Sequence, residues 1–346
     1  MGKSSNAKGG FGAVFAKDAE FLYYNGQRKI RKARLIARSD RAPRVVEDWA
    51  VPITHSSTLT LSADENVLIV TDTAGGHYGL LAETGEILWR SVAIGEGDAG
   101  IILPDEGFLF ASWDGALQRI DPRDGKAVVK PLRPDHQIRK LQFAPALACA
   151  FYRRICPADS ERSKPSQSLW RLDVDTLEAR EILPLSVCND IAVDPSGKFA
   201  VMVDDLVFRA RPPSMSLLEY LLSQKNTQFD VCIHDLATQK VVQSRRFHFS
   251  DLTFNKLRWS PDGRIICFAS GKGFGFLRRG DLEPFAFVPA QLSSDVTFSA
   301  DGTLMFMTGW ETSTLLRVVD LVDYPFSAAQ QLAPSQRLHF RPPRTI

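Results

Sequence analysis

The fold of this chain is decided by the stretch Lys256-Leu257-Arg258-Trp259-Ser260-Pro261-Asp262-Gly263, which alternates apolar and polar residues and ends in a tight Pro/Asp/Gly turn. A second apolar run, Ile265-Ile266-Cys267-Phe268, follows at once, so the pattern is that of a strand, a turn and a strand. The phrase returns as Asp295-Val296-Thr297-Phe298-Ser299-Ala300-Asp301-Gly302, again followed by an apolar run. The segment is therefore a repeating unit.

Weaker copies of the phrase bring the total to seven. They lie at Ala13–Asp18, Leu59–Asp64, Ile101–Asp105, Lys140–Pro145 and Asp190–Gly197. The residues in the Pro261 position are Lys17, Ala63, Pro104, Pro145, Pro195, Pro261 and Ala300, at spacings of 46, 41, 41, 50, 66 and 39 residues. A period near 40 with four apolar runs in each unit is typical of propeller blades. The sequence predicts an all-β, seven-bladed β-propeller.

Seven blades account for nearly all of the 346 residues, so we expect a single propeller domain over 11–346 after a flexible N-terminus at 1–10. The blades are expected at approximately 11–52, 57–95, 98–132, 138–184, 188–248, 253–290 and 293–333. An extra copy of the innermost-strand pattern occurs at Arg337–Pro343. Because propellers commonly close when one terminus completes a blade begun by the other, residues 335–346 are expected to be a closure strand or tail beside the first blade.

Blade five is longer than the others and carries a predicted helix. Within the insert 209–229, residues Ser214–Gln224 change to helical periodicity, and Ser216 and Glu219 have the spacing of a capping box. The apolar side of the helix consists of Met215, Leu217, Leu218, Leu221 and Leu222. Two interpretations follow: the helix folds back on the rim of the blade, or it binds a partner.

Composition points to a cytoplasmic protein without cofactors. The first ten residues contain no apolar stretch of a secretory signal, and no run of 18 apolar residues occurs. The five cysteines, Cys149, Cys156, Cys188, Cys232 and Cys267, form no Cys-x-x-Cys pair, which disfavours a disulfide framework or a zinc site. We therefore expect reduced structural thiols and a cytoplasmic location.

The repeat phrases resemble those of bacterial propeller-repeat proteins. Ile191–Phe199 is similar to the YVTN/lactonase-like phrase, Leu257–Gly263 to the TolB-like phrase, and the chain as a whole resembles the wider WD40-like group. Glu83–Trp89 is similar to the repeat of quinoprotein propellers, but the chain shows no export signal. The resemblance implies the fold and little about activity, because enzymes and scaffolds share these motifs.

The sequence carries no catalytic motif, and its six histidines are scattered singly, so we expect no catalytic or metal-binding residues. One column of the repeat nevertheless stands out: it consists of the residues that lie five positions before each residue in the Pro261 position. It contains Gly12, Thr58, Ala99, Lys140, Asp190, Lys256 and Asp295. We expect the four charged members to line the central channel and to pair between adjacent blades; a site for a small anion is the alternative.

Positive charge is concentrated in the first blade. The net charge of the chain is +2, yet residues 1–50 contain 11 Lys and Arg against 5 Asp and Glu. The cluster consists of Arg28, Lys29, Arg31, Lys32, Arg34, Arg38, Arg41 and Arg44. A solvated rim is one interpretation and a docking surface for an acidic protein is another. The sequence favours a non-enzymatic protein-interaction module; the alternatives are a lactonase-like enzyme with an axial metal and electrostatic nucleic-acid binding through the first blade.

Overall fold

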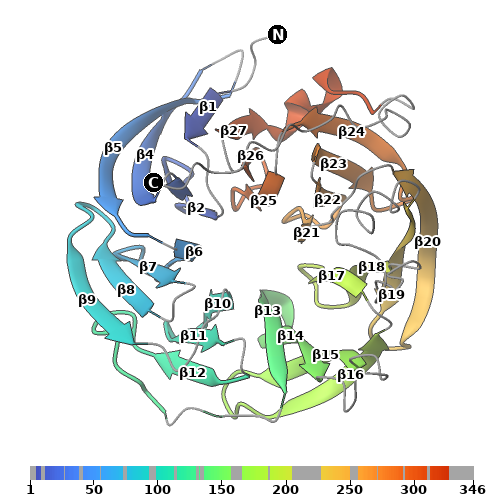
Figure 1. Ribbon diagram of the computed structural model, residues 1–346, viewed down its shortest axis with the longest axis horizontal. Helices are drawn as coiled ribbons and strands as arrows, with labels where there is room; N and C mark the ends of the chain where they lie inside the picture. Colours follow the sequence, from blue (N-terminus) through green and yellow to red (C-terminus); the bar gives the residue numbers. More distant parts are fainter. Residues whose placement is uncertain are drawn as a thin grey trace, which may run out of the picture.

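The computed structural model shows seven small β-sheets arranged in a ring (Figure 1), which confirms the predicted seven-bladed propeller. It describes residues 5–8, 12–26, 28–38, 42–54, 56–72, 76–92, 99–112, 115–129, 132, 136–156, 166–185, 188–204, 227–249, 256–270, 272–290, 293–309 and 312–326. No helix within these ranges has the length and apolar composition that crossing a membrane would require.

Five blades are antiparallel four-stranded sheets whose strands follow one another along the chain, the first lying nearest the axis. Blade one contains β2 (Ala13–Phe15), β3 (Phe21–Gly26), β4 (Lys29–Ile36) and β5 (Arg44–Pro52); blade two contains β6 (Ser56–Leu61), β7 (Val67–Asp72), β8 (Gly76–Leu81) and β9 (Ile87–Val92). Blade four contains β13 (Gln137–Ala144), β14 (Cys149–Cys156), β15 (Ser166–Asp173) and β16 (Ala179–Leu185). Blade five contains β17 (Cys188–Val193), β18 (Phe199–Asp204), β19 (Thr227–Asp235) and β20 (Lys240–Phe249); blade six contains β21 (Lys256–Trp259), β22 (Ile265–Ser270), β23 (Gly273–Arg278) and β24 (Pro284–Pro289).

The repeat phrase forms its turn through local hydrogen bonds. The Ser260 hydroxyl donates to Asp262 (2.5 Å) and accepts the N–H of Ile265 (2.9 Å), so one side chain joins the end of β21 to the start of β22. Asp262 also accepts the N–H of Arg264 (3.0 Å). Gly263 takes the left-handed φ of 68° that a residue without a Cβ adopts at little cost. The same serine–aspartate pairing occurs in blades two and seven, between Ser62 and Asp64 and between Ser299 and Asp301.

Blade three differs from the expected four strands. Within the described residues, its sheet contains three strands: β10 (Ala99–Ile102), β11 (Phe108–Ala111) and β12 (Leu117–Ile120). The described part of the segment expected to return as the fourth strand meets β12 at two isolated bridges, Leu117 with Leu132 and Ile120 with Ala127. Four residues separate the two contacts on one side and two on the other, so a regular ladder cannot form between them.

The ring closes through the N-terminus. Blade seven contains β25 (Ser293–Phe298), β26 (Leu304–Gly309) and β27 (Thr312–Arg317), and its outermost strand is β1 (Ser5–Lys8). Ser5 lies opposite Leu315 and Lys8 opposite Thr312 in antiparallel register. Residues 5–8, expected to be part of a flexible end, thus form a strand. Blade one takes all four of its strands from residues 13–52, and the expected closure segment 335–346 lies outside the described residues.

After β27 the chain turns back towards blade six. The short 3-10 helix η2 (Val318–Asp323) leads to Tyr324, whose carbonyl accepts the N–H of Phe287 (2.9 Å), and Phe326 donates its N–H to Phe285 (3.2 Å). Residues 324–326 therefore run along the outer edge of β24. An edge strand covered in this way has fewer unpaired backbone groups available to a second chain.

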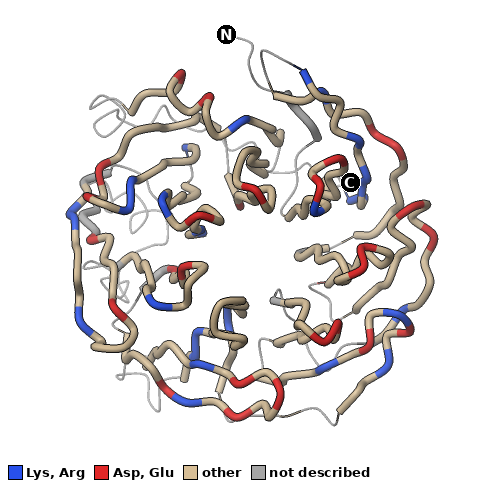
Figure 2. The backbone as a smooth tube through the Cα atoms, turned by 180° about the vertical axis from the view of Figure 1, so that it is seen from behind, with Lys and Arg blue, Asp and Glu red and all other residues tan. Residues whose placement is uncertain are grey.

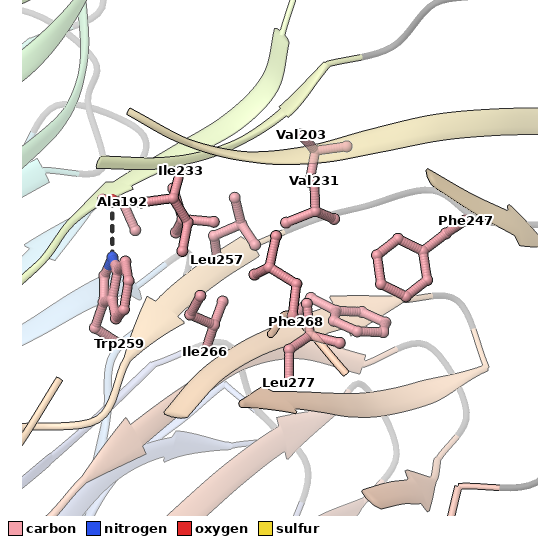
Figure 3. Packing of buried hydrophobic residues seen from close by; sticks show 12 residues of the cluster. Ala192, Val203, Val231, Ile233, Phe247, Leu257, Trp259, Ile266, Phe268 and Leu277 are labelled. Carbon is pink, nitrogen blue, oxygen red and sulfur yellow. Dashed lines mark hydrogen bonds between the residues drawn. The ribbon is translucent and has the colours of Figure 1, made fainter. Parts of the chain in front are cut away.

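The core lies between adjacent blades rather than within one layer. Figure 3 shows the contact of blades five and six, where Val203 and Val231 meet Leu257 and Phe268. Each blade thus covers the apolar face of its neighbour, as both faces of a propeller sheet require. The insert of blade five falls largely within residues 205–226, so the expected helix lies outside the described residues.

Candidate functional site

The innermost strands of blades four, five and six meet at a buried ion pair. Lys140 of β13 donates to the carboxylate of Asp190 in β17 and to the carbonyl of Leu257 in β21 (2.9 Å). The same Asp190 oxygen accepts the N–H of Leu257 (2.7 Å). The Lys140 and Asp190 side chains are only 7% and 6% exposed, so this pair joins three blades in a setting from which water is largely excluded.

A second pair joins blades six and seven. Arg258 of β21 binds Asp295 of β25 through two parallel hydrogen bonds, from Nε at 3.0 Å and from a terminal nitrogen at 2.7 Å. Lys256 lies two residues before Arg258, and alternation along a strand directs both side chains to the same face of β21. Lys256 is partly exposed and forms no ion pair with another described residue. The five described residues Lys140, Asp190, Lys256, Arg258 and Asp295 are called the inner-strand cluster below. It contains three cations and two carboxylates.

Burial and like charges act together on Lys140. The pKa of Lys140 is lowered to about 7, mainly because burial removes the ammonium group from water; Asp190 opposes this effect, and the positive charges of Arg258 and Lys256 add to it. For Asp295, burial raises the pKa, but Arg258, Lys256 and Lys140 outweigh burial and hold the pKa below its ordinary value. Below pH 7 the protonated lysine is the main form of Lys140, and its ammonium group donates directly to the Asp190 carboxylate.

Backbone irregularities place these side chains. Strands β13, β17 and β25 each shift register at the column position, between Arg139 and Gln142, Cys188 and Ile191, and Ser293 and Asp295. Lys140 occupies the bulge of β13 with a left-handed φ of 54°, which is unfavourable for a residue with a side chain. The bulge turns the lysine out of the regular alternation of its strand.

The sequence column therefore locates part of this site. Lys140 and Asp190 pair across adjacent blades as expected, whereas Asp295 pairs with Arg258 instead of Lys256. Arg258 was missed because it lies two residues after the column position. Gln142 was also missed; its amide donates to the carbonyl of Ile191 (3.1 Å) and accepts the N–H of Val193 (2.9 Å).

The basic cluster of blade one separates into exposed and buried members. Arg28, Lys29, Arg34, Arg38 and Arg44 are exposed, while Arg41 lies outside the described residues. Arg34 lies 3.9 Å from Asp48, a loose contact with a side chain that is 60% exposed. The other four exposed members form no ion pair with a described residue. Arg28 and Lys29 lie where β4 begins, and Arg38 and Arg44 lie at its other end. These four, Arg28, Lys29, Arg38 and Arg44, are together called the blade-one basic surface below.

Arg31 and Lys32 do not belong to this surface. Arg31 is 2% exposed and pairs with Glu47 on the adjacent strand β5. Lys32 is 7% exposed, and its ammonium lies 4.1 Å from the centre of the Phe21 ring, a cation–π contact. Their inclusion in a docking surface was wrong, because both side chains are enclosed by the blade itself.

Other candidates for chemistry are structural in the described residues or lie outside them. His136 is buried and stacks on Tyr152, with its Nε2 3.3 Å from the tyrosine hydroxyl. His77 is fully buried against Phe108 and Phe110. The described residues contain no group of three His, Cys, Asp or Glu side chains placed to hold a metal. The apolar residues predicted in the blade-five insert, Met215, Leu217, Leu218, Leu221 and Leu222, lie outside the described residues.

No protein-family model matches this chain, and a search of curated proteins finds no match.

Proposed function

We propose that this propeller is a non-enzymatic binding module that docks an acidic protein through the blade-one basic surface. The observation that supports the proposal most directly is the position of Arg28, Lys29, Arg38 and Arg44, exposed on one blade without ion pairs to described residues. Figure 2 gives the distribution of Lys and Arg around the ring for comparison with this blade. Exposed charges of one sign raise the rate at which an oppositely charged partner associates.

Lys140 and Arg258 of the inner-strand cluster differ from the blade-one basic surface in how their charges are paired. The charges of Lys140 and Arg258 are already committed to Asp190 and Asp295, and these contacts join neighbouring blades. The blade-one basic surface differs because its charges remain in contact with solvent. Long, solvated cations next to a rigid sheet are suited to electrostatic docking.

An acidic protein is favoured over nucleic acid as the partner. Binding of single-stranded nucleic acid commonly adds aromatic side chains on which bases stack. Tyr23 and Tyr24, which lie five and four residues before Arg28, are 4% and 3% exposed and belong to the core. They cannot present ring faces to bases in this state, so only contacts to the phosphate backbone would remain.

The test compares two charge-reversal variants by biolayer interferometry. Arg28→Glu, Lys29→Glu and Arg44→Glu are combined in the test variant, and Arg180→Glu, Lys240→Glu and Arg264→Glu, exposed residues of blades four to six, in the control. The probes are a biotinylated ten-residue glutamate peptide and a 20-base-pair DNA duplex. We expect peptide binding at 50 mM NaCl to weaken at least tenfold in the test variant only.

Equal loss in both variants would show that net charge alone drives binding and would overturn the proposal. Tighter binding of the duplex than of the peptide, lost in the test variant, would assign the surface to nucleic acid. Circular dichroism of both variants checks that the sheets remain intact, since exposed substitutions usually change the free energy of unfolding by about 0.5 kcal/mol or less.

A further inference from the structure

The inner-strand cluster is one negative charge short of neutrality. Among the described residues, Lys140, Lys256 and Arg258 contribute three positive charges, and Asp190 and Asp295 contribute two negative charges. Both carboxylates are already bound, one by Lys140 and the other by both prongs of Arg258. The excess charge is therefore centred on Lys256.

The excess lies on the partly exposed Lys256, next to charged groups that water screens poorly. Asp190 and Asp295 are 5% and 8% exposed, and the Lys140 side chain is 7% exposed. The reach of the fields is evident from pKa effects: Lys256 acts on Lys140 of blade four and on Asp295 of blade seven. Uncompensated charge in such surroundings costs more than at a fully hydrated surface, so an anion that binds Lys256 is stabilised.

We propose that Lys256, supported by Arg258 and Lys140, forms a binding site for the carboxylate group of a small molecule on the inner strands of the propeller. One carboxylate supplies the single negative charge that the cluster lacks. A phosphate dianion would leave a net negative charge and would face repulsion from Asp190 and Asp295. The site is independent of the blade-one basic surface, so either proposal can fail without the other.

The surrounding groups determine how the site responds to pH. The titratable and charged groups that face Lys140 or Asp295 are Asp190 on β17, Lys256 and Arg258 on β21, Cys267 on β22 and Asp295 on β25. Burial raises the pKa of the Cys267 thiol well above its ordinary value, so this group stays neutral. Lys140, with a pKa of about 7, is then the group that changes charge between pH 6 and pH 9. Its deprotonation removes the excess positive charge.

The experiment measures binding of sodium acetate to the full chain by saturation-transfer NMR and by thermal unfolding at constant ionic strength, with NaCl as the reference salt. A ligand that binds the folded state raises the melting temperature according to its concentration and Kd. We expect acetate to stabilise the protein at pH 6, with affinity at least tenfold lower at pH 9. Exposed lysines cannot produce this change, because their pKa near 10.4 keeps them charged at both values.

Three variants test whether acetate binds at Lys256. Lys256→Met should lower the affinity for acetate at least tenfold, Lys256→Arg should retain it, and Lys198→Met, in an inner turn of blade five, should leave it unchanged. Equal acetate binding by Lys256→Met and the parent, or no acetate effect in the parent beyond that of NaCl, would overturn the proposal. Stronger binding of sulfate, which is a dianion at pH 6, than of acetate would also contradict it. If Lys256→Met fails to fold, Lys256→Gln replaces it in the same comparison.

Discussion

The indole N–H of Trp259 donates to the carbonyl of Ala192 at 2.9 Å, and this bond links the innermost strand of blade six to that of blade five (Figure 3). Two other tryptophans make the same kind of contact at the rim. Trp49 donates to Glu83 (3.0 Å) and Trp89 to Pro122 (2.7 Å), in each case to the next blade along the chain. Neighbouring blades are thus joined by directional bonds as well as by apolar contact.

Replacing Trp259 by Phe tests how much the hydrogen bond between Trp259 and Ala192 contributes to the free energy of unfolding. The substitution keeps an aromatic ring but removes the bond to the carbonyl of Ala192, a residue that retains its partner Val201 in the β17–β18 ladder, and one such hydrogen bond contributes about 0.5–1.5 kcal/mol. We expect the free energy of unfolding to fall by that amount in urea titrations. Trp170→Phe is the control, because its indole bonds to Ser168 of its own strand (2.8 Å) and should contribute less. Equal losses would remove the special role of the contact between blades.

Gly275 and Phe268 form a tightly fitted pair. They lie opposite each other on β23 and β22, and a Cβ on Gly275 would lie 2.0 Å from an atom of the Phe268 ring. Phe268 is 1% exposed and cannot move into solvent, so Gly275→Ala should destabilise the fold by about 1–3 kcal/mol. Gly280→Ala meets nothing within 4 Å and should leave the melting temperature nearly unchanged. A stable Gly275→Ala protein would show that the ring has room to shift.

His77 makes stability depend on pH. Desolvation lowers its pKa from 6.5 to about 4, and neither ring nitrogen has a hydrogen-bond partner among the residues that the structure describes. Between these values the unfolded state binds the proton and the folded state does not, so the stabilising contribution is complete above pH 6.5 and is lost as pH falls towards 4. The difference corresponds to about 3 kcal/mol. Urea titrations at pH 7.5 and pH 4.5 should show a smaller loss for His77→Leu than for the parent; equal losses would contradict this account.

Deletion of residues 1–8 should weaken the ring. The deletion removes β1 and leaves the outer edge of β27 without its partner strand, so backbone donors and acceptors become exposed. We expect a lower melting temperature and concentration-dependent aggregation, measured by differential scanning fluorimetry and light scattering. Deletion of 335–346 removes no described strand and serves as the comparison. If deletion of 335–346 lowered the melting temperature more than deletion of 1–8, the C-terminal segment rather than β1 would be the one that closes the ring.

The number of blades could be predicted from sequence because the repeat is defined by short-range chemistry. The hydrogen bonds of Ser260, Asp262 and the backbone around Gly263 all lie within five residues, so the phrase indicates its own turn wherever it occurs. The column of inner charges follows from the same alignment. Lys140 and Asp190 lie at equivalent positions in adjacent blades and pair there.

The closing strand and the burial of the basic residues could not be predicted in the same way. β1 has the sequence Ser-Asn-Ala-Lys, with no apolar alternation to distinguish a strand. Its partner strand β27 lies about 300 residues further along the sequence. Arg31 is buried because Glu47 approaches it from the next strand in a ladder with a register shift. Both outcomes depend on pairing between strands, which local sequence does not specify.

Closure by β1 also determines when the ring can be completed while the chain is being synthesised. Ser5 is synthesised some three hundred residues before its partner Leu315. At about 5–20 residues per second, the first strand waits roughly 15 to 60 s for the sheet it completes. Blades one to six can assemble during that time, whereas the seventh cannot. The ring of the nascent chain therefore stays open until Leu315 has been made, and a bulky domain fused immediately before Ser5 would hinder the last step of assembly rather than the first.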